Sequence, residues 1–192
     1  MPPIKKFDKE AIISVAYDIA KKEGFEGINA RRIASILGCS VQPIFHNFTS
    51  MEELNKEVYN RIYNKYKEYM TNARKNPTNP YKEMGLAYIR FAANYPEFFK
   101  IIFMQHTNLS AENLITNDDM GNDVIKAGME LTGLTFEEQK SLHVRVWIFT
   151  HGIACLVATK SVEFKDNEIT SLLEESVRQM VIGYKYESGE KK

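Results

Sequence analysis

The segment between Ile33 and Ile44 constrains the fold more than any other part of this sequence. Two helices that cross at a sharp turn need a small residue where they meet, a glycine where the backbone takes positive φ, and an apolar residue that anchors the second helix. Ala34, Gly38 and Ile44 provide these features at offsets of four and six residues. The sequence therefore predicts a helix-turn-helix unit over residues 8–54.

The whole chain is predicted to be all-α, because apolar residues recur at helical spacing and strand patterns are nearly absent. Gly, Pro and Asn clusters separate about nine helices. We expect a three-helix N-terminal domain followed by a second helical domain. The expected helices cover residues 8–24, 29–37, 41–47, 50–72, 80–94, 96–106, 118–132, 136–160 and 168–185, with a polar loop at 107–117.

Polar residues suited to capping mark several helix starts. Asp8, Asn29 and Ser40 are placed to cap the first three helices. Two Ser/Thr-x-x-Glu capping boxes begin at Ser50 and Thr135. These positions fix where the predicted helices begin.

The third predicted helix has the features of a DNA-reading element. Pro43 costs little in its first turn, where N–H groups have no intrahelical partner, and those free N–H groups suit a phosphate. Gln42 can pair with adenine, while Val41 and Pro43 can touch a thymine methyl group. We expect these residues and His46 to face a DNA groove. The alternative is that Gln42 and His46 are ordinary exposed residues.

This N-terminal pattern resembles that of the TetR/AcrR family of bacterial transcriptional regulators. The resemblance covers about residues 8–60 in order and spacing. It rests on Gly24, Ile33-Ala34, Gly38-Cys39-Ser40, Phe45-His46-Asn47-Phe48 and Met51-Glu52-Glu53-Leu54. It implies a homodimeric, ligand-responsive repressor, not an enzyme, that binds a palindromic double-stranded DNA operator. Such a repressor releases the operator when a small effector binds.

Two positions depart from the family pattern and affect DNA contact. Phe45 stands where the family usually has Tyr, and Met51 stands where it usually has Lys. A hydroxyl and a cation that reach phosphate are thus absent, so Arg31, Arg32 and the N-terminal lysines are expected to compensate. The alternative to DNA contact for Phe45 and Phe48, and the better explanation of both, is a place in the core. The predicted DNA-contact residues are Lys5, Lys6, Asn29, Arg31, Arg32, Ser40, Val41, Gln42, Pro43, Phe45, His46, Asn47 and Ser50.

The segment Asn76–Pro80 is the clearest linker, because two prolines so close disfavour a continuous helix. We place a DNA-binding domain at residues 1–54, continuing into a connecting helix to about residue 72. The resemblance implies that residues 73–192 form a helical domain for ligand binding and dimerisation.

Aromatic side chains of the second part could line a roomy apolar pocket between helices, or equally form a plain core. Trp147 and His151-Gly152, with the segment Asn94–Phe103, resemble the C-terminal signature of one family subclass. His143 and His151 share a helix stripe about 12 Å long, too far apart for a metal pair. They are either polar anchors for an apolar or aromatic effector, or core or interface histidines. The predicted ligand-binding residues are Phe91, Tyr95, Phe98, Phe99, Phe103, Met104, Met120, His143, Trp147 and His151.

The last two helices are expected to form a four-helix bundle with those of a second subunit. The segment Val144–Val157 is apolar nearly all round, and the last helix carries a wide apolar stripe. The alternative is a purely intramolecular core. The predicted dimer residues are Phe149, Ile153, Leu156, Leu173, Val177, Met180 and Val181.

Charge and composition fit a cytoplasmic regulator. The net charge is zero, but residues 1–75 carry +4 and residues 76–192 carry −4, which suits a DNA-facing first part. Cys39 and Cys155 show no metal spacing, and no metal or cofactor is expected. Neither a signal peptide nor a membrane span is expected, because the apolar stretch Val146–Thr159 is too short.

Two other functions remain open at this point. An enzyme could use His143 or His151 as an acid or base, but the sequence offers no nucleophile elbow, phosphate-binding glycine loop or metal spacing beside them. A helix-turn-helix scaffold could also serve protein contact instead of DNA contact.

Overall fold

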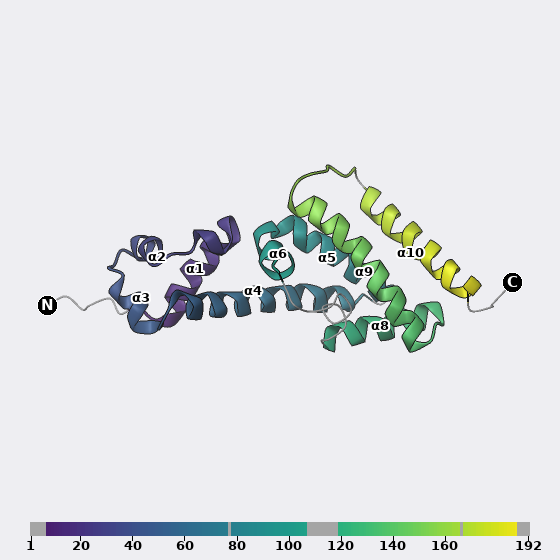
Figure 1. The fold of residues 1–192 in the computed structure, drawn as a ribbon, viewed down its shortest axis with the longest axis horizontal. Coiled ribbons are helices and arrows are strands. Elements are labelled where there is room, and N and C mark those ends of the chain that lie inside the picture. The colour runs from purple at the N-terminus through teal and green to yellow at the C-terminus, as the bar shows by residue number, and fades with distance from the viewer. Residues whose placement is uncertain (1–6, 77, 107–118, 166, 188–192) are drawn as a thin grey trace. The chain divides into compact units, whose positions relative to one another are not determined.

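The computed structural model describes residues 7–76, 78–106, 119–165 and 167–187, and within these ranges the chain is helical and holds no strand (Figure 1). This confirms the all-α prediction. The described helices are α1 (Lys9–Glu23), α2 (Ala30–Leu37), α3 (Gln42–Asn47), α4 (Met51–Arg74), α5 (Pro80–Asn94), α6 (Pro96–Phe103), α8 (Asp119–Thr132), α9 (Phe136–Ala158) and α10 (Glu168–Glu187). A 3-10 turn, Phe25–Gly27, follows α1. The expected loop at 107–117 lies outside the described residues.

The helix α1 begins and ends at the residues that its sequence predicts. The Asp8 side chain accepts a hydrogen bond of 2.8 Å from the backbone N–H of Ala11, which satisfies one of the free donors of the first turn. At the other end, Gly24 takes φ +70° and ψ −169°, where the chain leaves the helix. Between these caps, Ile12, Ala16 and further apolar side chains are buried along one face.

The turn between α2 and α3 depends on Gly38, as predicted. Asn29 caps α2 by accepting a 2.9 Å hydrogen bond from the N–H of Arg32. Gly38 ends the helix in the left-handed region, at φ +70° and ψ 37°, which glycine adopts without steric cost. The Ser40 cap is wrong, because α3 begins at Gln42 after Val41 and no side chain caps it.

The two predicted capping boxes differ in their detail. At α9 the box is complete, because Thr135 and Glu138 each bond to the other's backbone. At α4 the Ser50 hydroxyl accepts a 3.3 Å bond from the N–H of Glu53. The Glu53 carboxylate, however, accepts its bond from the N–H of Thr49 at 2.7 Å. The second box therefore closes one residue earlier than the sequence pattern suggests.

The chain divides into two compact units. The first comprises Met1–Glu68 and Tyr95–Gln105, and the second comprises Tyr69–Asn94 and His106–Lys192. The long helix α4 passes from one unit into the other, and α5 and α6 belong to different units although Tyr95 alone separates them. This division by packing is not the functional division proposed at residue 72, which stays a prediction.

In the first unit, α6 completes the core around α1 and the first part of α4. The rings of Tyr17 and Phe98 are 4.8 Å apart between centroids. Tyr66 of α4 meets Phe103 edge-on at 5.1 Å. Aromatic pairs in this distance range add to the stability that burial supplies. A helix from later in the sequence therefore belongs to the core of the unit that holds the helix-turn-helix.

In the second unit, α9 packs against α5, α8 and α10. Leu134, Leu142 and Val146 form a buried cluster, and side chains of α10 pack against it. By length and composition alone, the full helix α9 is long and apolar enough to cross a bilayer, which is weak evidence for a membrane span. A core helix of a soluble protein passes the same test, and α9 lies among three neighbouring helices.

Candidate nucleic-acid interface and candidate ligand cavity

The short helix α3 presents two distinct faces. Ile44 and Phe48 are four residues apart and face inward, with Ile44 fully buried and Phe48 only 2% exposed. Val41 and Phe45 are also four residues apart, but they lie on the surface, and Phe45 is 53% exposed. The core assignment therefore holds for Phe48 and is wrong for Phe45, because one position along a helix rotates the side chain by about 100°.

The exposed face of α3 has the chemistry of a groove-reading surface. Gln42 and His46 are exposed beside Val41 and Phe45, and Pro43 is half-buried. The amide of Gln42 can donate to and accept from an adenine edge, and the apolar side chains suit thymine methyl groups. The structure thus brings together the four residues expected to face a groove, with Phe45 as a fifth.

Three predicted DNA-contact residues use their polar atoms within the scaffold. Asn29 caps α2, and Ser50 caps α4. The Asn47 side chain donates to the carbonyl oxygens of Pro43 at 2.8 Å and Phe7 at 3.2 Å. Asn47 thereby ties α3 to Phe7, just before the N-cap of α1. Asn29 and Ser50 thus stabilise helix starts, Asn47 positions α3, and Ser40 is exposed beside α3.

The predicted cations differ in their surroundings. Arg31 is exposed, and the described part of the chain shows no ion pair for it. Arg32 forms a two-pronged ion pair with Glu23, and this guanidinium lowers the pKa of the Glu23 carboxyl. Glu23 therefore competes with a phosphate for Arg32. Lys5 and Lys6 lie outside the described residues.

Two surface residues of the first unit, one cationic and one apolar, are not among the predicted contact residues. Lys9 donates to Glu57 at 2.9 Å and lies 5.1 Å above the ring of Phe48. Ile36 on α2 is 57% exposed, although its position in the sequence pattern gives no sign of this. Lys9 is therefore engaged in the scaffold, whereas Ile36 extends the apolar surface of the unit.

The predicted ligand-binding residues are divided between the two units. Tyr95, Phe98, Phe99, Phe103 and Met104 belong to the first unit, and Phe98 and Phe99 are fully buried in its core. Phe91, His143, Trp147 and His151 belong to the second unit. The side chain of Met120 lies outside the description. No described cavity brings these residues together, and their role in ligand binding stays a prediction.

Both histidines of α9 are hydrogen-bonded inside the second unit. His143 Nδ1 lies 3.3 Å from the hydroxyl of Tyr81, and His151 Nδ1 lies 2.9 Å from the hydroxyl of Tyr88. Trp147 stacks on His151 with centroids 4.6 Å apart. Burial lowers the pKa of His151, which favours the neutral ring. These contacts match the alternative interpretation, in which both histidines are satisfied within the core.

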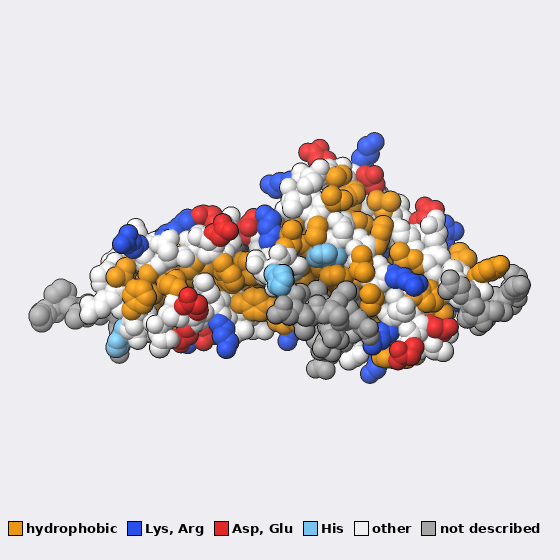
Figure 2. Space-filling model, viewed as in Figure 1, with side chains coloured by type: hydrophobic (Ala, Val, Ile, Leu, Met, Phe, Trp, Pro, Cys, Tyr) orange, Lys and Arg blue, Asp and Glu red, His pale blue; other side chains and the backbone are white. Residues whose placement is uncertain are grey.

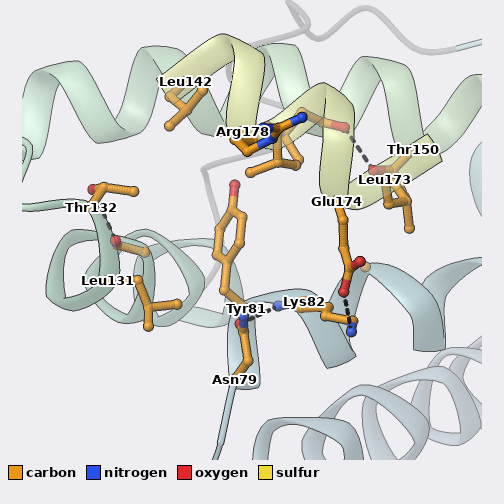
Figure 3. Close-up of a pocket in the computed structure, with 14 residues that line it drawn as sticks. Asn79, Tyr81, Lys82, Leu131, Thr132, Leu142, Thr150, Leu173, Glu174 and Arg178 are labelled. Atoms are coloured by element: carbon orange, nitrogen blue, oxygen red, sulfur yellow. Dashed lines mark hydrogen bonds and ion pairs between the residues drawn. The ribbon is translucent and has the colours of Figure 1, made fainter. Parts of the chain in front are cut away.

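A cavity of about 350 Å³ lies among α5, α8, α9 and α10 (Figure 3). None of the predicted ligand-binding residues lines it. Its wall combines apolar side chains of α9 and α10 with polar side chains at the start of α5, the end of α8 and the middle of α10. Sequence reasoning missed this cavity because its lining residues are far apart in the chain. The only local signal is a pair of polar residues, Tyr81 and Lys82, directly after Pro80.

The predicted dimer residues lie on α9 and α10, but several contact their own chain. Leu173 is buried, and Val177, Met180 and Val181 pack against the buried cluster of the second unit. Ile153 is buried, Phe149 is half-buried, and Leu156 is exposed. Figure 2 shows hydrophobic side chains on the surface over α9 and α10. The large exposed hydrophobic residues on these helices are Phe136, Ile148, Leu156, Leu172, Ile182 and Tyr186.

Cys39 and Cys155 are both free thiols. Cys155 Sγ lies 3.4 Å from His151 Nε2, and burial raises the pKa of this thiol. The described part of the chain holds no group of three or more His, Cys, Asp or Glu side chains that could bind a metal ion.

The arrangement of helices, with its helix-turn-helix, is shared with solved structures of helical transcriptional regulators. Two solved structures of this class match nearly the whole chain. One is a candidate fatty acid metabolism regulator of Clostridium perfringens, with 17% identity, a TM-score of 0.58, and coverage of 90% of this chain and 97% of its own. The other is a transcriptional regulator from Rhodococcus sp. Rha1, with 15% identity, a TM-score of 0.59, and coverage of 92% and 97%.

These similarities concern the fold, because both identities are low. No family model matches the sequence, and no curated protein matches it. The chain therefore has the fold of helical transcriptional regulators.

Proposed function

We propose that this protein is a ligand-responsive transcriptional regulator of the TetR type, acting as a homodimeric repressor. The observation that carries the proposal is the geometry around Gly38. A left-handed glycine joins α2 to α3, Ile44 and Phe48 anchor α3 inward, and Gln42 and Phe45 stand on its outer face. A short, rigidly anchored helix with free polar and apolar side chains suits entry into a major groove.

In this proposal the contacts divide into reading and gripping roles. Gln42, Val41 and Phe45 read base edges, while Arg31 and the N-terminal lysines neutralise phosphates. Arg32 can contact a phosphate only when it leaves Glu23. Among the described residues, Arg31 therefore supplies most of the phosphate contact.

A dimer supplies the spacing that a palindromic operator requires. Two reading helices must lie about 34–36 Å apart to enter successive major grooves. We assign the dimer contact to α9 and α10, whose exposed hydrophobic residues would otherwise remain in water. A small apolar or aromatic effector would release the operator by changing that spacing. The named role of the Clostridium perfringens protein in fatty acid metabolism is compatible with an apolar effector here.

The test is a fluorescence-anisotropy titration of the purified protein against the DNA upstream of its own gene. We expect sequence-selective binding that weakens as salt rises. Gln42→Ala should cost about 1–3 kcal/mol at one base position. Arg31→Gln should weaken binding to all sequences and reduce the salt slope by about one unit.

The matched control is Lys126→Gln, which removes an exposed cation of α8 in the second unit. Its salt slope should equal that of the unchanged protein. If the protein shows no preference for any upstream sequence over random DNA, the proposal fails. The helix-turn-helix would then be better explained as a scaffold for protein contact.

A further inference from the structure

We propose that the cavity among α5, α8, α9 and α10 binds a small amphipathic carboxylate, with its apolar body inside and its acid group at the mouth. Only the effector role of such a ligand rests on the proposed function. Binding of the ligand to the cavity does not depend on it. The cavity volume of about 350 Å³ lies at the lower end of the range for small-molecule sites, roughly 300–1,000 Å³. The ligand is therefore a compact one.

The interior of the cavity is suited to an apolar body. Leu142, Val146 and Leu173 line it, and all three are buried. The polar atoms of its wall are already bonded within the protein. The Thr150 hydroxyl donates to the carbonyl of Val146 at 2.7 Å, and the Tyr81 hydroxyl lies 3.3 Å from His143 Nδ1. A ligand inside therefore meets mainly apolar surface, which favours apolar groups.

The mouth of the cavity carries charge. Lys82 of α5 forms an ion pair with Glu174 of α10, and Arg178 lines the cavity one turn further along α10. Figure 3 shows this ion pair on one side of Tyr81 and the Thr132 end of α8 on the other. Two cations and one carboxylate thus line the site, and Glu175, at 3.7 Å from Arg178, lies outside the lining.

This arrangement favours an anion over a cation. The Lys82 side chain is 32% exposed, whereas the Glu174 side chain is 54% exposed. An incoming carboxylate can take the place of Glu174 on Lys82, while Glu174 turns into water at small cost because an exposed ion pair contributes little. A cationic ligand would instead lie beside Lys82 and Arg178, and like charges repel.

The absence of a side chain at one position keeps the cavity open. Gly85 lies within α5 and lines the cavity, and a Cβ built there meets no heavy atom within 4 Å. A Cβ is therefore accommodated at this position without a clash. Because glycine lowers the stability of a helix interior, its replacement should not weaken α5.

A ligand in this cavity would act directly on α10. Leu173 and Val177 form part of the wall, and Glu174 holds α10 to α5 through Lys82. The same helix exposes Leu172 and Ile182 on its surface. Binding of a carboxylate would exchange an α5–α10 contact for a ligand contact, and would thus change the support of a helix that we assign to the dimer.

The first experiment measures binding without DNA, by isothermal titration calorimetry on the full chain. The probes are decanoate, decanol and decylamine, which share an apolar chain and differ in the charge of the head group. Decanoate is expected to bind most tightly and decylamine most weakly. The proposal is overturned if the three bind equally, if the amine binds best, or if decanoate does not bind.

The second experiment locates the site. Gly85→Leu fills the cavity, so decanoate binding should weaken by more than about tenfold. The matched control is Ala93→Leu, an exposed position on the same helix outside the cavity, which should leave binding unchanged. Unaltered binding by Gly85→Leu would place the ligand elsewhere and overturn the assignment.

Two charge variants are expected to shift decanoate affinity in opposite directions. Lys82→Met should weaken binding about tenfold, and Glu174→Gln should strengthen it several-fold because Lys82 loses its competing partner. Lys126→Met is the control for removing a cation. If the ion pair is purely structural, both changes would weaken binding or neither would alter it, and either result contradicts the proposal.

Operator release is measured separately, so that the two proposals can fail independently. If decanoate binds as described and leaves DNA affinity unchanged, the cavity assignment stands and the effector part of the proposed function fails. If the protein binds no operator at all, the calorimetry still decides the cavity assignment.

Discussion

Two glycines at helix ends, Gly24 and Gly38, should respond differently to the same substitutions. Both have φ of +70°, but ψ is 37° at Gly38 and −169° at Gly24. Gly38 therefore lies in the left-handed helical region, which Asn tolerates. Gly24 lies in a region that essentially only glycine occupies. Alanine is therefore unfavourable at both positions, whereas asparagine should be tolerated at Gly38 only.

The expected magnitudes follow from the backbone and from the space around it. A Cβ at Gly38 meets nothing within 4 Å, so Gly38→Ala costs only the left-handed backbone, about 1–2 kcal/mol. Gly38→Asn should recover most of this loss. At Gly24 the backbone alone costs about 1–3 kcal/mol for any side chain, and a Cβ lies 3.4 Å from Glu97 Oε2. Gly24→Asn should thus be no better than Gly24→Ala.

Urea unfolding followed by far-ultraviolet circular dichroism measures these differences as shifts in the midpoint at constant slope. All variants are compared at one protein concentration, because a dimer's stability depends on it. Gly183→Ala is the control, since a Cβ at this position of α10 also meets nothing within 4 Å. The φ of Gly183 is not positive, so the free energy of unfolding of the Gly183→Ala variant should rise or stay equal. Equal recovery by asparagine at both positions would refute the reasoning.

Four further outcomes are expected. Met51→Lys should steepen the plot of log affinity for DNA against log salt by about 0.9, measured by anisotropy over a range of salt concentrations, and an unchanged slope would mean that no phosphate lies near the start of α4. Burial lowers the pKa of His151 below its usual 6.5, so the folded protein binds fewer protons than the unfolded chain, and stability should fall as pH drops below about 6.5. Urea midpoints across this range should fall less steeply for His151→Gln, and equal slopes would exclude His151 as the cause. Gly128→Ala should cost about 1–3 kcal/mol, because its Cβ would lie 2.2 Å from Gln139 Nε2, and a double-mutant cycle with Gln139→Ala should show a smaller loss in the second background. Ile182→Glu places a charge on the exposed face of α10, so sedimentation should show a monomer, and a persisting dimer would move the interface elsewhere.

The helix pattern was readable from the sequence where local chemistry determines it. Asp8, Asn29 and Thr135 cap helices as predicted because a capping side chain bonds to N–H groups only a few residues away. Gly38 takes positive φ for an equally local reason. The end of α6 at Phe103, three residues before the predicted end, shows the usual uncertainty of helix boundaries.

The candidate sites were less predictable, because they depend on residues distant in the chain. Lys82 and Glu174 are 92 positions apart, yet they share the mouth of one cavity. Phe98 was expected beside a ligand but packs against Tyr17 of α1. An apolar side chain has the same sequence pattern whether it faces a cavity or a neighbouring ring, so only the packing of the helices separates the two.

The joint at Tyr95 bears on how this protein could be dissected. The chain enters the second unit within α4, leaves it between α5 and α6, and returns after Gln105. A fragment ending near residue 72 would lack α6, and would expose the rings of Tyr17 and Tyr66 that Phe98 and Phe103 cover. A fragment that contains the helix-turn-helix and is expressed alone should therefore include α6, joined to α4 by a short linker. Tyr95 also links α5 of the second unit directly to α6 of the first. A displacement of α5 can therefore be transmitted through the backbone to the unit that contains α3.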